Sequence, residues 1–243
     1  MRDYLLDLVE HTFDLGCVDL IKITGTDKET TIEGLAEDRS VVIQGRFLAP
    51  VPEFIGTFGM PNLNKLKILL NLGEYRENAL ITVQKQNKNS QDVPVGLHFV
   101  NAAGDFKNDY RFMTSEIVAE KLKTAKMKPV AWHVEFEPTV AGIQRLKMQS
   151  QANAEESNFQ AKTDGNDLKF YFGDHSTHAG EFVFHPAVTG QLKRAWSWPK
   201  VQIISILDST GDKTMRISDE GAAKITVNSG IAEYNYILPA QTK

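Results

Sequence analysis

Three histidines and one aspartate whose side chains could bind a metal lie close together: Asp174, His175, His178 and His185. Imidazole and carboxylate groups are common zinc ligands, so a metal-dependent enzyme is one hypothesis for this chain. Their spacing does not match two ligands on one helical face, and Gly173, Gly180 and Pro186 indicate loop and strand. We therefore favour a polar turn here, and we expect neither a metal nor another cofactor.

Other patterns that would indicate catalysis are weak or missing. Glu135 and Glu137 flank Phe136 and would share one face of a strand, which two solvent-facing carboxylates explain. The sequence has no GxxxxGK[ST], GxGxxG, GxSxG or paired CxxC motif. Its single cysteine, Cys17, excludes an internal disulfide and suits a buried small residue better than a reactive thiol. We expect a protein that is not an enzyme.

Basic side chains concentrate in three segments with helical patterns, although the formal net charge of the chain is −4. These segments are 61–71, 139–152 and 187–200. The best-defined helix is 139–152, in which Val140, Ile143 and Leu146 form the expected apolar face. That geometry points Arg145 away from the core and leaves Lys147 near its edge. Basic helices in an acidic chain predict a surface that contacts phosphates without reading bases.

The candidate phosphate contacts fall into two groups. The stronger candidates point away from the apolar faces of 139–152 and 187–196: Arg145, Lys193 and Arg194. The others flank an apolar face or follow a helix: Lys65, Lys67, Lys147 and Lys200. The segment 2–15 departs from this pattern, because four acids outnumber Arg2 there. Ordinary solvated helix faces are the competing interpretation for each single residue.

The periodicity of apolar residues predicts the elements that would position these side chains. Helices are expected at 2–15, 61–71, 139–152 and 187–196. Strands are expected at 18–24, 30–35, 41–47, 79–85, 95–100, 109–113, 131–136, 159–163, 168–172, 181–184, 201–207, 214–218, 222–227 and 232–238. A polar loop is expected at 85–91. Each half thus contains helices and strands in a similar order, which predicts an α+β protein with domains 1–115 and 130–243 and a connector at 116–129.

Nothing in the sequence predicts insertion in a membrane. No apolar run approaches the length of about 18 residues that a membrane-spanning helix needs, and the N-terminus lacks a signal-peptide pattern. We expect a soluble cytoplasmic protein.

The C-terminal residues Tyr236-Ile237-Leu238-Pro239, after a hairpin that begins at Gly221, resemble the tails of DNA sliding clamps. The element order over nearly the whole chain is also similar to that family, and the second half most resembles the phage-type clamp. The resemblance implies two tandem clamp domains, with helices lining a ring and antiparallel sheets outside. Two domains per chain imply a homotrimer.

The resemblance also implies a function and partners. The expected function is that of a DNA polymerase processivity factor that encircles double-stranded DNA without sequence preference. The expected partners are the replicative DNA polymerase and a clamp-loader ATPase, and a phage-encoded chain would act in the host cytoplasm. By resemblance, a hydrophobic pocket for partner motifs would be formed by residues of the connector, of the segment after the last helix and of the tail: Val118, Leu122, Val201, Ile203, Ile237, Leu238 and Pro239.

A second hypothesis remains open at this point. A β-rich structural or assembly protein of a virion would explain many strands and self-association without DNA binding. A basic surface formed by paired helices would favour the clamp.

Overall fold

The computed structural model describes residues 1–88, 91–123, 129–174, 176 and 178–241. Parts of the predicted polar loop and of the predicted connector, together with His175, therefore lie outside the described residues. The chain forms two compact units, Met1–Ala125 with Ser229–Tyr234, and Lys126–Asn228 with Asn235–Lys243. We call them the N-terminal unit and the C-terminal unit.

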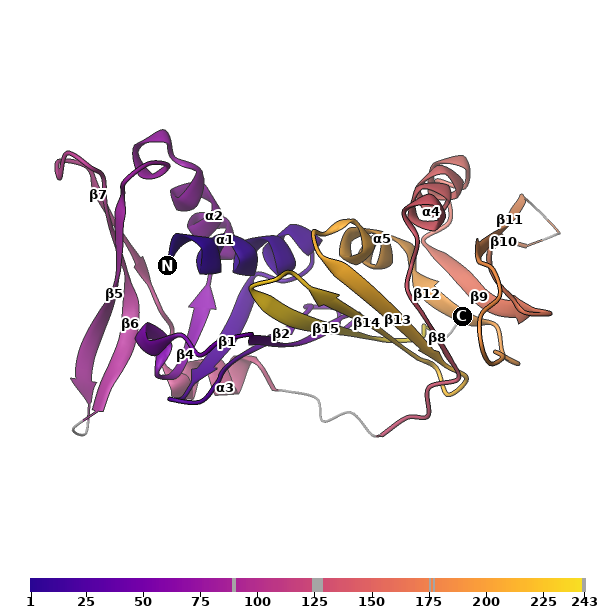
Figure 1. The fold of residues 1–243 in the computed structure, drawn as a ribbon, viewed down its shortest axis with the longest axis horizontal. Coiled ribbons are helices and arrows are strands. Elements are labelled where there is room, and N and C mark those ends of the chain that lie inside the picture. The colour runs from indigo at the N-terminus through magenta and orange to yellow at the C-terminus, as the bar shows by residue number, and fades with distance from the viewer. Residues whose placement is uncertain (89–90, 124–128, 175, 177, 242–243) are drawn as a thin grey trace. The chain divides into compact units, whose positions relative to one another are not determined.

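The N-terminal unit contains two antiparallel sheets and a pair of contacting helices, α1 and α2 (Figure 1). One sheet has the order β4-β1-β2-β3 and continues with the first residues of β15, and the other has the order β5-β6-β7. The elements are α1 (Arg2–His11), β1 (Leu20–Gly25), β2 (Thr30–Leu35), β3 (Val42–Phe47), β4 (Gly56–Pro61), α2 (Leu63–Asn71), β5 (Leu80–Lys88), β6 (Gln91–Val100), β7 (Lys107–Arg111) and α3 (Ser115–Lys121). Short 3₁₀ turns lie at Phe13–Leu15, Pro52–Phe54 and Gly73–Tyr75.

Alternating burial explains the first sheet. Ile21 and Ile23 of β1 and Ile32 of β2 are fully buried, while their sequence neighbours are partly exposed. This period of two gives the sheet one apolar face, and α1 and α2 lie on one side of it (Figure 1). Leu5 of α1 and Leu66 of α2 are fully buried.

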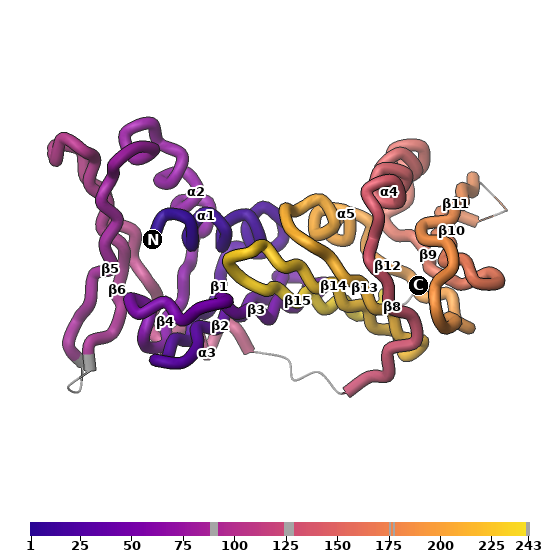
Figure 2. The backbone as a smooth tube through the Cα atoms, viewed as in Figure 1, coloured from indigo at the N-terminus to yellow at the C-terminus, as the bar shows by residue number. Residues whose placement is uncertain are grey.

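The C-terminal unit has the same plan, with contacting helices α4 and α5 and two antiparallel sheets (Figure 1). One sheet has the order β11-β10-β9-β12, and the other has the order β15-β14-β13-β8, which can be followed along the backbone in Figure 2. The elements are β8 (Val134–Phe136), α4 (Val140–Ala152), β9 (Asn158–Asp164), β10 (Asp167–Gly173), β11 (Ala179–His185), β12 (Trp196–Pro199), α5 (Lys200–Asp208), β13 (Asp212–Ser218), β14 (Ala222–Asn228) and β15 (Ala232–Pro239). Four stacked or tilted phenylalanines fill its core: Phe159, Phe170, Phe172 and Phe184.

Two predicted elements are wrong. Residues 187–195 form an irregular segment instead of a helix, because Ala187 and Gly190 both have positive φ values, 54° and 92°. A side chain at Gly190 would lie 1.9 Å from the carbonyl oxygen of His133, so only glycine fits there. The predicted strand 201–207 is instead helix α5, which buries Ile203, Ile206 and Leu207 and leaves Val201 exposed.

The remaining differences are smaller. Strands β4 and β12 were not predicted, because the glycines of Gly56–Pro61 and the proline that ends Trp196–Pro199 weaken the strand pattern. The predicted loop at 85–91 is mostly strand, since β5 extends to Lys88 and β6 begins at Gln91. In the described residues, no helix is both long and apolar enough to cross a membrane.

Candidate nucleic-acid interface

Helix α2 presents two lysines in different environments. The Lys67 ammonium lies 2.8 Å from the Asp14 carboxylate and 5.8 Å from the centre of the Phe13 ring. Asp14 follows α1 in the turn Phe13–Leu15, so this ion pair joins the two helices of the N-terminal unit. Lys65 is exposed, and among the described residues its ammonium makes no hydrogen bond or ion pair. Of the two predicted phosphate contacts on α2, only Lys65 presents an uncompensated charge.

Helix α1 is acidic in sequence, and two of its charged side chains, Asp7 and Arg2, are satisfied within the N-terminal unit. Asp7 is buried, and the hydroxyl of Tyr234, a residue of β15, donates a 2.7 Å hydrogen bond to its carboxylate. The His11 ring stacks on the Tyr234 ring with centroids 4.7 Å apart. Arg2 donates hydrogen bonds to the carbonyl oxygens of Leu70, at 2.7 Å, and Tyr75, at 3.3 Å. The Arg2 guanidinium therefore satisfies carbonyl groups at the C-terminal end of α2 and in the turn that follows it.

Helix α4 begins where the Thr139 hydroxyl accepts a 3.0 Å hydrogen bond from the Gly142 amide. The helix packs against β11 through Gly142, where a Cβ would lie 2.6 Å from the carbonyl oxygen of Phe184. Leu146 is the large side chain buried along this face. Val140 does not join it: the side chain is 76% exposed, which corrects the predicted core face.

Arg145 is exposed on α4, as the periodicity predicts, and its guanidinium contacts strand β11. Nη1 donates a 3.1 Å hydrogen bond to the carbonyl oxygen of Val183, and the guanidinium carbon lies 5.4 Å from the centre of the Phe182 ring. These contacts hold the side chain against β11 while its charge remains uncompensated by a carboxylate. It remains a candidate phosphate contact.

The other two predicted contacts near α4 have different roles. Lys147 forms an ion pair with Asp208, the last residue of α5, which joins the two helices of the C-terminal unit. Lys200 is only 6% exposed, and its ammonium donates to the carbonyl oxygens of Asn153, at 2.9 Å, and Ser150, at 3.3 Å. Lys200 therefore caps the C-terminal end of α4 and does not reach a phosphate.

Lys193 and Arg194 are exposed but lie away from the helices. The Arg194 amide donates a 2.9 Å hydrogen bond to the Asp219 carboxylate, in the turn between β13 and β14. Strand β13 separates that turn from the end of α5 by seven residues, or about 20 Å. The two residues therefore lie at the far end of β13, which removes them from the helix surface.

The residues predicted to line a partner pocket are mostly core. Val118, Ile203 and Leu238 are fully buried, and Leu122 and Ile237 are nearly so. Only Val201 and Pro239 are exposed, and they belong to helix α5 and strand β15.

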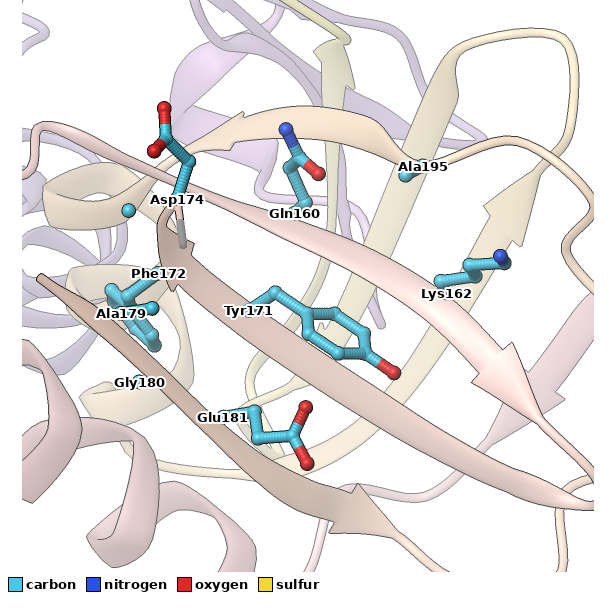
Figure 3. A pocket seen from close by; sticks show the side chains of 10 residues that line it. Gln160, Lys162, Tyr171, Phe172, Asp174, Ala179, Gly180, Glu181 and Ala195 are labelled. Atoms are coloured by element: carbon cyan, nitrogen blue, oxygen red, sulfur yellow. The ribbon is translucent and has the colours of Figure 1, made fainter. Parts of the chain in front are cut away.

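Each unit has an open groove of about 500 Å³ among its described residues. The groove of the N-terminal unit has a volume of about 520 Å³, and its lining includes Leu35, Arg39, Asn62, Met113, Lys121 and Leu122. The groove of the C-terminal unit has a volume of about 500 Å³ and lies over β9, β10 and β11 (Figure 3). Tyr171 lies in its centre, with Glu181 beside it and Lys162 on the neighbouring strand (Figure 3).

Among the described residues, the side chains considered for catalysis lie in ordinary polar contacts. Asp174 accepts hydrogen bonds from the amide and hydroxyl of Ser176, as expected for a polar turn. Among the described residues, no three His, Cys, Asp or Glu side chains are placed to hold a metal. Burial raises the pKa of the Cys17 thiol to about 11, so it stays protonated near neutral pH.

Comparison with known proteins identifies the fold. No family model and no curated protein sequence matches the chain. Solved structures do match: PCNA of A. fulgidus with the C-terminal region of FEN-1 has a TM-score of 0.72 and 8% identity, covering 100% of this chain and 97% of that one. PCNA from Thermococcus kodakaraensis has a TM-score of 0.68 and 11% identity, covering 99% and 97%.

The proliferating cell nuclear antigen of Entamoeba histolytica is similar as well, with a TM-score of 0.64, 9% identity and coverage of 99% and 94%. The chain therefore has the fold of the PCNA-type sliding clamps over its whole length. This confirms the predicted α+β clamp fold.

Proposed function

We propose that this chain is the protomer of a ring-shaped sliding clamp that encircles duplex DNA and tethers a replicative DNA polymerase. The observation that carries the proposal is the full-length match to PCNA, in which nearly all of both chains is covered. A clamp acts by topology and needs no catalytic residues.

The two units per chain and the edge strands of their sheets support a homotrimer. Strand β7 pairs only with β6, and β11 pairs only with β10, among the described residues. Pairing β7 of one protomer with β11 of the next would continue both sheets and remove both edges. Such a head-to-tail interface makes a closed ring when the rotation between protomers closes.

The helix pairs would then face the DNA. Among the described residues, no carboxylate compensates the positive charge of Lys65 or Arg145. Contacts of this kind with phosphates are independent of sequence, as sliding requires. A clamp-loader ATPase would open the ring, since this sequence has no nucleotide-binding motif.

We further propose that partner proteins bind at the groove of the N-terminal unit. The similar A. fulgidus structure contains the C-terminal region of FEN-1 bound to PCNA. Leu35 and Leu122 supply apolar surface in the groove, and Arg39 and Lys121 supply charge. A viral source and a location in the host cytoplasm stay predictions from the sequence.

The decisive experiment measures mass and DNA retention together. Sedimentation of the purified protein should give three times the protomer mass, and the clamp-loader ATPase of the same source should load the ring onto nicked circular DNA. Linearising the DNA should release it, because a topological link ends when the ring can slide off. A strict monomer at micromolar concentration, or equal retention on circular and linear DNA, would refute the proposal. A trimer that never retains DNA would favour the virion hypothesis.

A further inference from the structure

We propose that Asp14 and Asp208 weaken the grip of the helix surfaces on DNA by neutralising Lys67 and Lys147. This inference rests on the proposed clamp function and concerns how tightly the ring holds its DNA. It assigns a role to two acidic residues that no sequence pattern connects to the lysines, since they lie 53 and 61 positions away.

The same ion pair occurs once in each unit. In the N-terminal unit Lys67 of α2 pairs with Asp14, just beyond α1, at 2.8 Å. In the C-terminal unit Lys147 of α4 pairs with Asp208, at the end of α5. Each aspartate thus belongs to, or directly follows, the helix that packs beside the lysine-bearing helix.

These pairs are exposed enough for their charge to matter to a ligand. Side-chain exposure is 43% for Lys67 and 36% for Asp14, and 28% for Lys147 and 58% for Asp208. Exposed ion pairs contribute little to folding stability. Electrostatic attraction extends over a Debye length of about 10 Å, within which a paired carboxylate cancels most of the lysine's attraction for a phosphate.

The remaining helix cations strengthen the argument. In the described parts of α1, α2, α4 and α5, every lysine and arginine except Lys65 has a protein acceptor. The acceptors are backbone carbonyls for Arg2, Arg145 and Lys200, and carboxylates for Lys67 and Lys147. Only the carboxylates cancel a lysine's charge, so Asp14 and Asp208 are the residues that neutralise Lys67 and Lys147.

Apart from Arg145, the described outward face of α4 supplies no substitute for the lost charge. Val140 and Met148 are 76% and 60% exposed, and Gln144 between them is exposed and uncharged. Val201 of α5 is exposed as well. Apart from Arg145, a duplex against this surface would meet apolar and neutral groups, which make no ionic contacts with phosphates.

The test is the salt dependence of binding to a short linear duplex, measured by fluorescence anisotropy. The variant Asp14→Asn/Asp208→Asn should bind about tenfold more tightly at low salt. The slope of log K against log salt concentration should steepen by about 0.9 for each additional phosphate contact. The control Asp27→Asn/Glu53→Gln removes the same charge from exposed positions outside these helices and should leave the slope unchanged.

A second pair of variants separates freed lysines from a structural effect. Lys67→Gln/Lys147→Gln should barely change the slope in the wild-type chain, where both charges are neutralised. The same changes added to the Asp14→Asn/Asp208→Asn chain should abolish its gain. An unchanged slope in the Asn variant, or a gain that survives loss of both lysines, would overturn the inference.

Retention of the wild-type ring on circular DNA is measured in the same preparations. If the wild-type ring is retained on circular DNA and the Asp14→Asn/Asp208→Asn variant has an unchanged salt slope, only the role of Asp14 and Asp208 is refuted. If the wild-type ring is not retained on circular DNA, both the clamp function and this inference are refuted.

Discussion

Replacing the buried lysine of the C-terminal unit tests whether its charge serves folding or DNA. Lys200→Met keeps the length of the side chain and removes the ammonium that donates to Ser150 and Asn153. Hydrogen bonds from a charged group contribute about 1.5–3 kcal/mol each. The variant also no longer buries a charge, which offsets part of the loss. We expect a net destabilisation of about 2–4 kcal/mol.

The assay is thermal unfolding followed by circular dichroism, with the salt dependence of DNA binding measured in parallel. For a chain of this size, about 1 kcal/mol corresponds to about 2–4 °C, so the midpoint should fall by about 4–16 °C. The matched control is Lys65→Met, an exposed change whose effect on stability should be within about 0.5 kcal/mol. It should instead reduce the salt slope.

Opposite results would refute this assignment. If Lys200→Met unfolded like the wild type and lowered DNA affinity, Lys200 would face the DNA. The capping role at the end of α4 would then be wrong.

Two further predictions concern a buried carboxylate and a half-buried thiol. Tyr234→Phe removes the hydroxyl that donates to the buried Asp7 carboxylate. The free energy of unfolding, measured by urea titration, should fall by about 1.5–3 kcal/mol. A variant as stable as the wild type would show that Asp7 is satisfied without this hydrogen bond. Burial raises the pKa of Cys17 from its ordinary 9.0 to about 11. At pH 8 the folded protein should therefore have about 100-fold less Cys17 thiolate than a peptide thiol of ordinary pKa. Its reaction with iodoacetamide should be correspondingly slow, with a rate that rises towards pH 11. A rate equal to that of a peptide thiol would contradict the burial.

Much of the fold could be predicted because most strands have one buried face. Alternation in Thr30–Leu35 and Ala222–Asn228 reports directly which residues face the core. The helix Val140–Ala152 was predictable for a similar reason, since Thr139 and the helical spacing indicate its start and length.

The segment 201–207 shows where this reasoning fails. Val201, Ile203 and Leu207 satisfy the period of a strand, while Ile203, Ile206 and Leu207 satisfy that of a helix. Packing decided between them, because α5 lies against α4 and leaves Val201 in solvent. Local periodicity could not contain that information.

The candidate interface, too, could be predicted only in part from the sequence. The sequence by itself determined that lysines and arginines concentrate near three of the helix-like segments, and that Arg145 points away from the core. Only the tertiary structure decided which charges a phosphate could meet. Lys67 and Lys147 are neutralised by distant aspartates, and Lys200 of α5 is buried against the end of α4. Among the described lysines of α2, α4 and α5, only Lys65 stays unpaired. Ion pairing depends on distances between helices, which the order of residues along the chain does not specify.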